Sequence, residues 1–207
     1  MTVPASVASL DALTSAAVAT GLTVTSSASW PESDSDGEVP ALAGFIDSAF
    51  SPLVAEVVAR TLRGREPSDR ASGNRDAGDR ASGDRDAGDR VTAVVVVTAL
   101  GDVTSATRVA AVVDAGRRVP PLQFFQSVPN SVVGHLAARW HLTGPVACVT
   151  GTAAGLDMAA QLIEDADADE ALVVRVDLKV TDGDRDRAAA VLVTGPADRE
   201  RPGAAGT

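Results

Sequence analysis

The chain is short of several residue types that whole classes of function require. It has one cysteine in 207 residues, which excludes an internal disulfide and a metal site built from several thiolates. Aromatic residues make up only 3% of the chain and tyrosine is absent, so a core must be built from Ala, Val and Leu. No apolar run approaches the roughly 20 residues that a membrane-spanning helix needs. These absences favour a globular protein without a disulfide framework or a membrane anchor.

Positive charge is also scarce. The 18 Lys and Arg residues face 28 Asp and Glu residues, which gives a net charge of −10. Each contact to a phosphate needs a Lys or Arg side chain, so nucleic acids and anionic membranes are not expected as partners. Residues 1–19 are apolar but lack basic residues, unlike a secretory signal peptide. With 45% hydrophobic residues, we expect a folded, soluble α/β protein of the cytoplasm.

A repeat interrupts the chain at residues 67–90. Two ten-residue units, 71–80 and 81–90, differ only by Asn74 in the first and Asp84 in the second. Asp and Arg nearly balance here and no large apolar side chain occurs, so the segment cannot bury enough surface to offset its ordering entropy. We expect a disordered insertion in a surface loop, with a docking arm as the alternative. The polar tail 197–207 is also expected to be disordered.

The hydrophobic pattern outside the repeat alternates strands with helices. A continuous β-branched run at residues 91–98 predicts a strand covered on both faces. Ser51 and Pro52 predict a helix start, and Pro120-Pro121 indicates a break. The other expected strands are 22–25, 146–150, 171–176 and 189–193, and the other expected helices are 102–115, 129–140 and 154–164. This order implies a layered, largely parallel sheet, with a strand, loop and first helix in residues 1–66 and the core in residues 91–196.

One part of the chain carries a family likeness. Residues 121–137 hold a Pro/Phe segment followed by Ser127-Val128-Pro129-Asn130 at a helix start. Residues 140–145 end in a Leu-Thr-Gly-Pro turn, and residues 149–156 read Val-Thr-Gly-Thr-Ala-Ala-Gly-Leu at a strand-to-helix junction. This pattern resembles the N-terminal half of β-ketoacyl synthases. The resemblance is closest to the chain-length-factor proteins found beside type II polyketide and aryl-polyene systems.

The resemblance covers residues 91–195 well and residues 42–64 more loosely. It implies a thiolase-like half-fold of the α/β class, with a mixed, mostly parallel sheet and helices layered on it. Ketosynthases attack an acyl thioester with a thiol at the start of a buried helix, where the helix dipole and free amides lower the thiol pKa. Matching the chain to the family from Gly144-Pro145 onward puts Ala153 at the nucleophile position. Alanine has no group that could be acylated.

The remaining polar residues offer poor substitutes for a catalytic thiol. Cys148, five residues earlier, is expected in mid-strand as a small core hydrophobe whose pKa is not lowered. Thr152 carries a hydroxyl, but the sequence shows no base beside it. His135 is expected as a half-buried helix residue and His141 as a turn residue, with no third ligand close enough for a metal site.

No motif for a cofactor, phosphate or calcium is present either. Residues 151–155 lack the Lys-Ser/Thr pair of a phosphate-binding loop, and the acidic residues 164–170 lack the pattern of a calcium loop. The family's further catalytic residues come from its C-terminal half, and this chain ends soon after the first half-fold. We therefore expect neither a cofactor nor a metal.

Three functions remain open from the sequence. The first is a noncatalytic ketosynthase-like subunit of polyketide or fatty-acid-type biosynthesis, acting like a chain length factor or as a scaffold. The second is an active acyltransferase, a 3-oxoacyl-carrier-protein synthase, that uses Thr152 or Cys148 as its nucleophile. The third is a decayed α/β module, because duplicated decamers and a missing second half fit loose selection.

The first hypothesis predicts an interface. In the family that the chain resembles, the strand before the nucleophile turn pairs across a two-fold axis, and residues 146–149 form that strand here. An apolar strand edge without a neighbour needs a partner. We expect an intact ketosynthase or a second copy of this chain, with an acyl carrier protein as a further candidate. The candidate interface or binding residues are Asn130, Ser131, Cys148 and Val149.

Overall fold

The computed structural model describes residues 9–33, 35–65, 90–181 and 184–196. The predicted insertion at residues 67–90, apart from Arg90, and the predicted tail at residues 197–207 lie outside the described residues.

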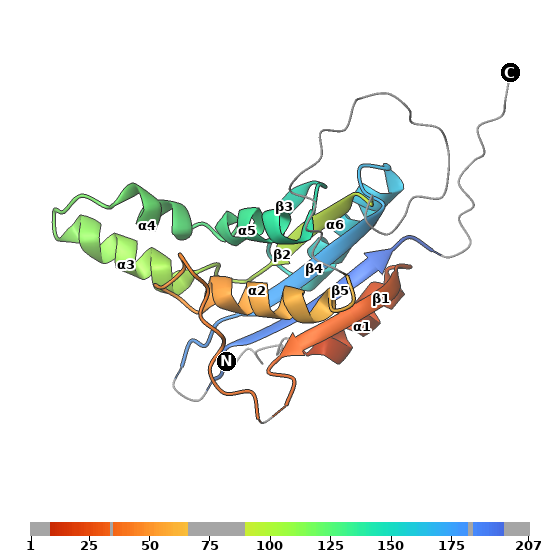
Figure 1. Cartoon of the computed structure of the whole chain (residues 1–207), viewed down its shortest axis with the longest axis horizontal. Coiled ribbons are helices and arrows are strands. Elements are labelled where there is room, and N and C mark those ends of the chain that lie inside the picture. Colours follow the sequence, from red (N-terminus) through yellow and green to blue (C-terminus); the bar gives the residue numbers. More distant parts are fainter. Residues whose placement is uncertain (1–8, 34, 66–89, 182–183, 197–207) are drawn as a thin grey trace, which may run out of the picture.

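The core of the fold is one five-stranded sheet with the strand order β1-β5-β4-β2-β3 (Figure 1). Its strands are β1 Thr23–Trp30, β2 Thr92–Val97, β3 Val146–Val149, β4 Glu170–Asp177 and β5 Arg187–Thr194. Strand β2 is parallel to both β3 and β4, whereas β5 is antiparallel to both β4 and β1. Four strands therefore run in one direction and β5 runs against them, which confirms the predicted mixed, mostly parallel sheet.

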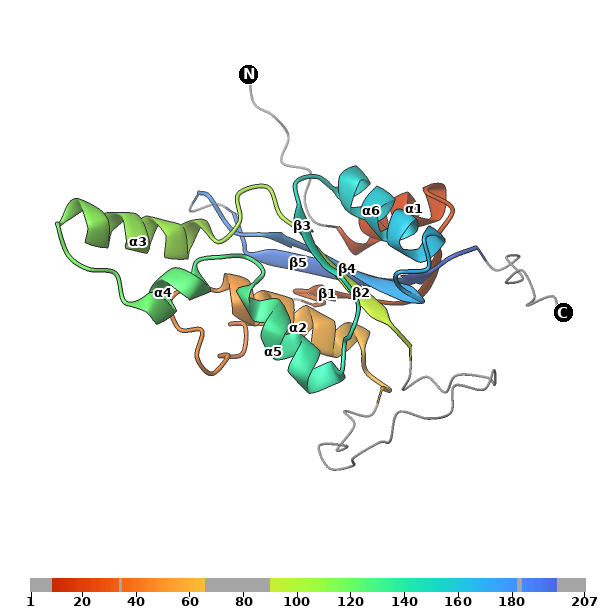
Figure 2. The ribbon, with the colours of Figure 1, turned by 90° about the horizontal axis from the view of Figure 1, so that it is seen from above.

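Helices cover both faces of the sheet. The helices of the described residues are α1 Leu10–Ala19, α2 Phe50–Thr61, α3 Val103–Asp114, α4 Pro121–Gln126, α5 Ser131–Trp140 and α6 Thr152–Glu164. Helices α1 and α6 lie on one face, and α2 and α5 lie on the other (Figure 2). The predicted layering is thus confirmed.

Strand β2 shows why the valine run forms an interior strand of the sheet. All its residues are buried. Val94 and Val96 pack into the core on the α2 and α5 side, while Val95 and Val97 pack into the core on the α1 and α6 side. A strand covered on both faces needs apolar side chains at every position, so the prediction from the β-branched run is confirmed.

Two helices were missed by the sequence interpretation. Helix α1 lies within residues 1–44, where the pattern predicted only a strand; just Leu13 and Ala17 of it are buried, so its apolar stripe is narrow. The predicted break is present, because α3 ends at Asp114 and Pro120 is extended, but the pattern missed α4, which begins at Pro121. Proline fits the first turn of a helix, where its missing N–H would have no partner.

Helices α3 and α4 project beyond the sheet (Figures 1 and 2). We call residues 100–128 the arm. Asp102 caps α3 by accepting a hydrogen bond from the Ser105 N–H at 3.0 Å. Ser105 is the one buried residue of α3, and α4 has none. The arm therefore contributes little to the core of this chain.

Within the part of the chain that the structure describes, no helix is long and apolar enough to cross a lipid bilayer.

Candidate functional site

The position matched to the family nucleophile lies at the start of α6. Strand β3 ends at Val149, and the chain turns through Gly151, whose φ of +91° is a conformation that glycine adopts without strain. Thr152 is the first residue of α6, and Ala153 is exposed in the first turn. The backbone N–H groups of that turn have no partner within the helix, and the helix dipole is positive there. This geometry would lower the pKa of a thiol, but residue 153 carries only a methyl group.

Gly155 holds α6 close to the sheet. A Cβ atom at this position would lie 2.4 Å from Cγ2 of Val97 in β2 and 3.5 Å from Cγ2 of Val149 in β3. Only a residue without a side chain permits this approach. Gly155 therefore fixes the start of α6 against the ends of both strands.

Thr152 has a cationic neighbour. Nη1 of Arg175 donates a hydrogen bond of 2.9 Å to Oγ1 of Thr152, and Nη2 of Arg175 forms an ion pair of 2.9 Å with Asp177. A guanidinium stays protonated and only donates hydrogen bonds, so Arg175 cannot take the proton of the Thr152 hydroxyl. The arrangement holds the threonine oxygen in place and supplies no base to activate it.

The sequence interpretation missed Arg175 as a member of this site. It lies 23 residues after Thr152. The feature that could have identified Arg175 is the sheet topology. Strands β3 and β4 both run parallel to β2, so the residues at their carboxyl ends meet at one edge of the sheet.

The expectation that Cys148 lies in the core was wrong, because its side chain is exposed. Cys148 pairs in register with Val96, whose side chain belongs to the core under α2 and α5. Strand β3 is the last strand of the sheet, and the core that these helices cover does not extend to Cys148. Partial burial raises the pKa of the Cys148 thiol, which agrees with the expectation that its pKa is not lowered.

The other candidate interface residues fall in two places. Val149 is half-buried and packs on the α6 side of the sheet. Asn130 precedes α5 and Ser131 begins it, on the opposite face. Oδ1 of Asn130 and Oγ of Ser131 are both buried and have no hydrogen-bond partner in the described part of the chain. The structure thus brings Cys148, Val149, Thr152 and Ala153 together along one strand-to-helix turn. Asn130 and Ser131 lie apart from this turn, on the other face of the sheet.

Both histidines lie where the sequence predicted. His135 is half-buried on α5, and His141 is an exposed residue with a φ of +53° that ends this helix. Among residues 9–33, 35–65, 90–181 and 184–196, no group of three or more His, Cys, Asp or Glu side chains could hold a metal ion.

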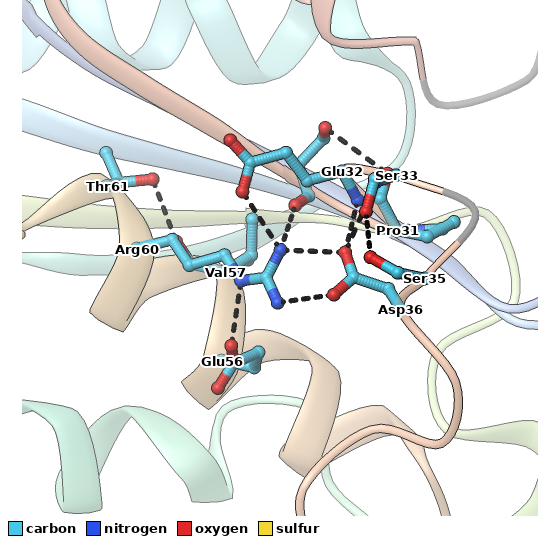
Figure 3. Close-up of polar contacts among 10 residues, drawn as sticks. Pro31, Glu32, Ser33, Ser35, Asp36, Glu56, Val57, Arg60 and Thr61 are labelled. Carbon is cyan, nitrogen blue, oxygen red and sulfur yellow. Dashed lines mark hydrogen bonds and ion pairs between the residues drawn. The ribbon is translucent and has the colours of Figure 1, made fainter.

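A second polar cluster surrounds Arg60 on α2 (Figure 3). Its side chain is only 9% exposed and forms ion pairs with Asp36 at 2.9 Å, Glu56 at 2.8 Å and Glu32 at 3.1 Å. The guanidinium also lies 4.5 Å from the centre of the Trp30 ring. Hydrogen bonds from Arg60 hold the pKa of Asp36 well below its usual range. The cluster fastens the loop after β1 onto α2.

A cavity of about 460 Å³ lies beside this cluster, with Trp30, Leu53 and Lys179 in its wall. Trp30 and Leu53 belong to the core on the α2 side of the sheet, whereas α6 packs on the other side. The cavity is therefore separate from the start of α6 and does not form an acyl pocket for position 153.

Comparison by sequence identifies no relative. No protein family matches the chain, and no curated protein matches it.

Comparison by structure identifies the fold. The chain is similar to one chain of a solved complex, that of the ketosynthase ApeO with its chain length factor ApeC from Xenorhabdus doucetiae. The TM-score is 0.59 and the identity 14%, over 84% of this chain and 79% of that chain. The protein therefore has a ketosynthase-like thiolase fold, which confirms the predicted α/β class and the predicted resemblance. At this identity the likeness establishes the fold alone.

Two further solved structures have TM-scores below 0.5, and no conclusion rests on them. The ishigamide ketosynthase/chain length factor is 22% identical over 55% of this chain and 38% of that chain, with a TM-score of 0.44. The 3-oxoacyl-[acyl-carrier-protein] synthase III from Aquifex aeolicus is 15% identical over 74% of this chain and 41% of that chain, with a TM-score of 0.39.

Proposed function

We propose that this protein is a noncatalytic ketosynthase-like subunit that pairs with a ketosynthase in polyketide or fatty-acid-type biosynthesis. It acts there like a chain length factor or as a scaffold. The observation that carries the proposal is Ala153 in the first turn of α6, where the resemblance puts the family's thiol. The start of α6 keeps the geometry of a nucleophile site and lacks the reactive atom.

The neighbouring groups support this reading. Thr152 receives a hydrogen bond from Arg175, which cannot act as a base. Burial raises the pKa of the Cys148 thiol, so little of it is the reactive thiolate near neutral pH. Neither residue gains support as a substitute nucleophile.

The free edge of β3 supports pairing with another chain. The N–H groups of Val94 and Thr98 donate to the carbonyl groups of Pro145 and Val149. Parallel strands alternate in their hydrogen bonding, so the N–H and C=O groups of Val146 and Cys148 point away from β2. Both of these side chains are exposed. An edge of this kind is a template for a strand of a partner.

A ketosynthase is the partner that the comparison favours. The solved complex to which this chain is similar contains a ketosynthase with its chain length factor. A second copy of this chain is the alternative partner for the same edge.

The first experiment tests for catalysis. The purified protein is incubated with an acyl-carrier thioester, and its intact mass is measured beside that of Thr152→Ala and Cys148→Ala. We expect no acyl adduct on any of the three. An adduct on the wild-type protein that is lost in either variant would establish an active acyltransferase and overturn the proposal.

The second experiment tests the partner. The chain is coexpressed with a candidate ketosynthase from the same genome, and the mass of the purified species is measured in solution. We expect a complex of one copy of each chain. Cys148→Pro removes an N–H that points away from β2, on an edge strand where proline is tolerated, although its ring also restricts the local backbone. It should abolish the complex, whereas Cys148→Ala should keep it. A monomer that binds no ketosynthase would refute the proposed function.

A further inference from the structure

Exposed apolar side chains concentrate on the arm. In the described part of the chain, ten large hydrophobic side chains are exposed, and six of them lie in residues 100–128. These six are Leu100, Val113, Leu122, Phe124, Phe125 and Val128. The two phenylalanines are 61% and 58% exposed in a chain that has four phenylalanines in all. Clustered exposed apolar surface of this kind marks an interaction site.

Within the described residues, few contacts hold the arm in place. Helix α3 packs against α4, and α4 packs against α5. Two side chains tie the arm to the loop before α2: Arg108 forms an ion pair of 2.6 Å with Asp47, and Gln126 donates a hydrogen bond to the Gly44 carbonyl. Two short helices gain most of their stability from burying an apolar face, and here much of that face has no cover.

The charge of this region differs from that of the rest of the chain. The segment that holds the arm, α5 and β3, residues 99–149, contains four arginines, two aspartates and no lysine or glutamate. Its net charge is therefore +2. The whole chain carries −10, so the remaining residues carry −12. Arg117 and Arg118 are exposed between α3 and α4, at the far end of the arm. An apolar surface with cations at its margin complements a partner surface that is apolar with acidic residues around it.

The arm is also continuous with the free edge of the sheet. It begins at Leu100, three residues after β2 ends, and β2 lies directly beside β3. Because β2 and β3 are parallel, the arm leaves the sheet at the end where β3 also terminates. A chain that pairs with β3 therefore lies next to the base of the arm.

We propose that the arm is a second docking surface for the ketosynthase that pairs with β3, with Leu122, Phe124 and Phe125 at its centre and Arg117 and Arg118 at its margin. This inference rests on the proposed function. It goes further in assigning to the arm a large share of the binding affinity and in requiring an apolar surface with an acidic rim on the ketosynthase.

The test measures the affinity of purified variants for the same purified candidate ketosynthase. Phe124→Ser combined with Phe125→Ser should raise the Kd by about 30-fold or more, because truncated aromatic anchors commonly cost this much. Arg117→Glu combined with Arg118→Glu should also raise the Kd, and the loss should diminish at high salt.

The chain offers a matched control pair. Val113 is 57% exposed and is the penultimate residue of α3, and Val18 is 60% exposed and is the penultimate residue of α1. In Val113→Glu and Val18→Glu the new carboxylate lies at the same position relative to the C-terminus of its helix. The unfavourable interaction of the carboxylate with the helix dipole is therefore similar in the two variants. We expect about a tenfold or larger rise in Kd for Val113→Glu and less than about a threefold change for Val18→Glu.

The outcomes separate this inference from the proposed function. If the arm variants bind as tightly as the wild type while Cys148→Pro does not bind, the inference fails and the proposed function stands. If the wild-type protein binds no ketosynthase, both fail. A self-associated wild type that the arm variants convert to monomers, without any binding to the ketosynthase, would assign the arm to a second copy and overturn the inference.

Discussion

Replacing Gly155 with alanine tests the packing that holds α6 against the sheet. The new Cβ atom would lie 2.4 Å from Cγ2 of Val97, a side chain that is only 2% exposed in a central strand. Overpacking a core in this way costs about 1–3 kcal/mol, and a contact this short belongs at the upper end. Alanine gains about 1 kcal/mol over glycine inside a helix. We expect a net loss of about 2 kcal/mol in the free energy of unfolding.

Gly134 is the control for this substitution. It lies inside α5, its surroundings are open to solvent, and a Cβ atom there would meet nothing within 4 Å. Gly134→Ala should therefore raise the stability by about 0.5–1 kcal/mol through helix propensity alone.

The assay is urea denaturation of the two variants and the wild type, followed by circular dichroism, with thermal melting as a second measurement. A loss of about 2 kcal/mol corresponds to a Tm about 4–8 °C lower for a chain of this size. If Gly155→Ala were as stable as Gly134→Ala, the close approach of α6 to β2 would be refuted.

Three further predictions concern ionisable groups. Arg60→Met removes the cation that lowers the pKa of Asp36. A depressed carboxyl pKa stabilises the fold above about pH 4, the ordinary aspartate value, and this contribution is lost as the pH falls. The difference in unfolding free energy between the wild type and Arg60→Met should therefore narrow in acid. A difference that is constant with pH contradicts this prediction. Glu170 is 1% exposed and forms ion pairs with Arg65 and Arg90, which lie on either side of residues 66–89. Glu170→Gln should therefore lower the free energy of unfolding, measured by urea denaturation, by about 2–3 kcal/mol. An unchanged denaturation midpoint contradicts this prediction. Because the pKa of Cys148 is raised, iodoacetamide should alkylate the folded protein more slowly at pH 8 than the same chain in urea; faster alkylation of the folded protein would contradict the structure.

Features that depend on neighbouring residues in the chain were predicted well. The valine run of β2 and the turn from β3 into α6 follow from periodicity and glycine. The likeness to ketosynthases also rests on local motifs, and the structure confirms the fold that it implied. Helices α1 and α4 were missed because one has a narrow apolar stripe and the other starts at a proline that also fits a break.

Features that depend on distant segments were not predictable in the same way. The sequence around Cys148 is apolar on both sides, which is typical of a core strand, yet the strand order leaves β3 at the edge and the thiol exposed. Arg175 reaches Thr152 because parallel strands bring their carboxyl ends together, which no spacing along the chain reveals. The six exposed apolar side chains of the arm have the composition of a core, and only their distance from the sheet shows that they remain uncovered.

The sequence by itself determined which residue stands at the start of α6, because the identity of residue 153 is a covalent fact and the turn before it is encoded locally. The tertiary structure decided what surrounds that position and which surfaces stay open. Strand order and helix placement are set by the burial of all apolar faces together, and that balance depends on contacts between segments far apart in the chain.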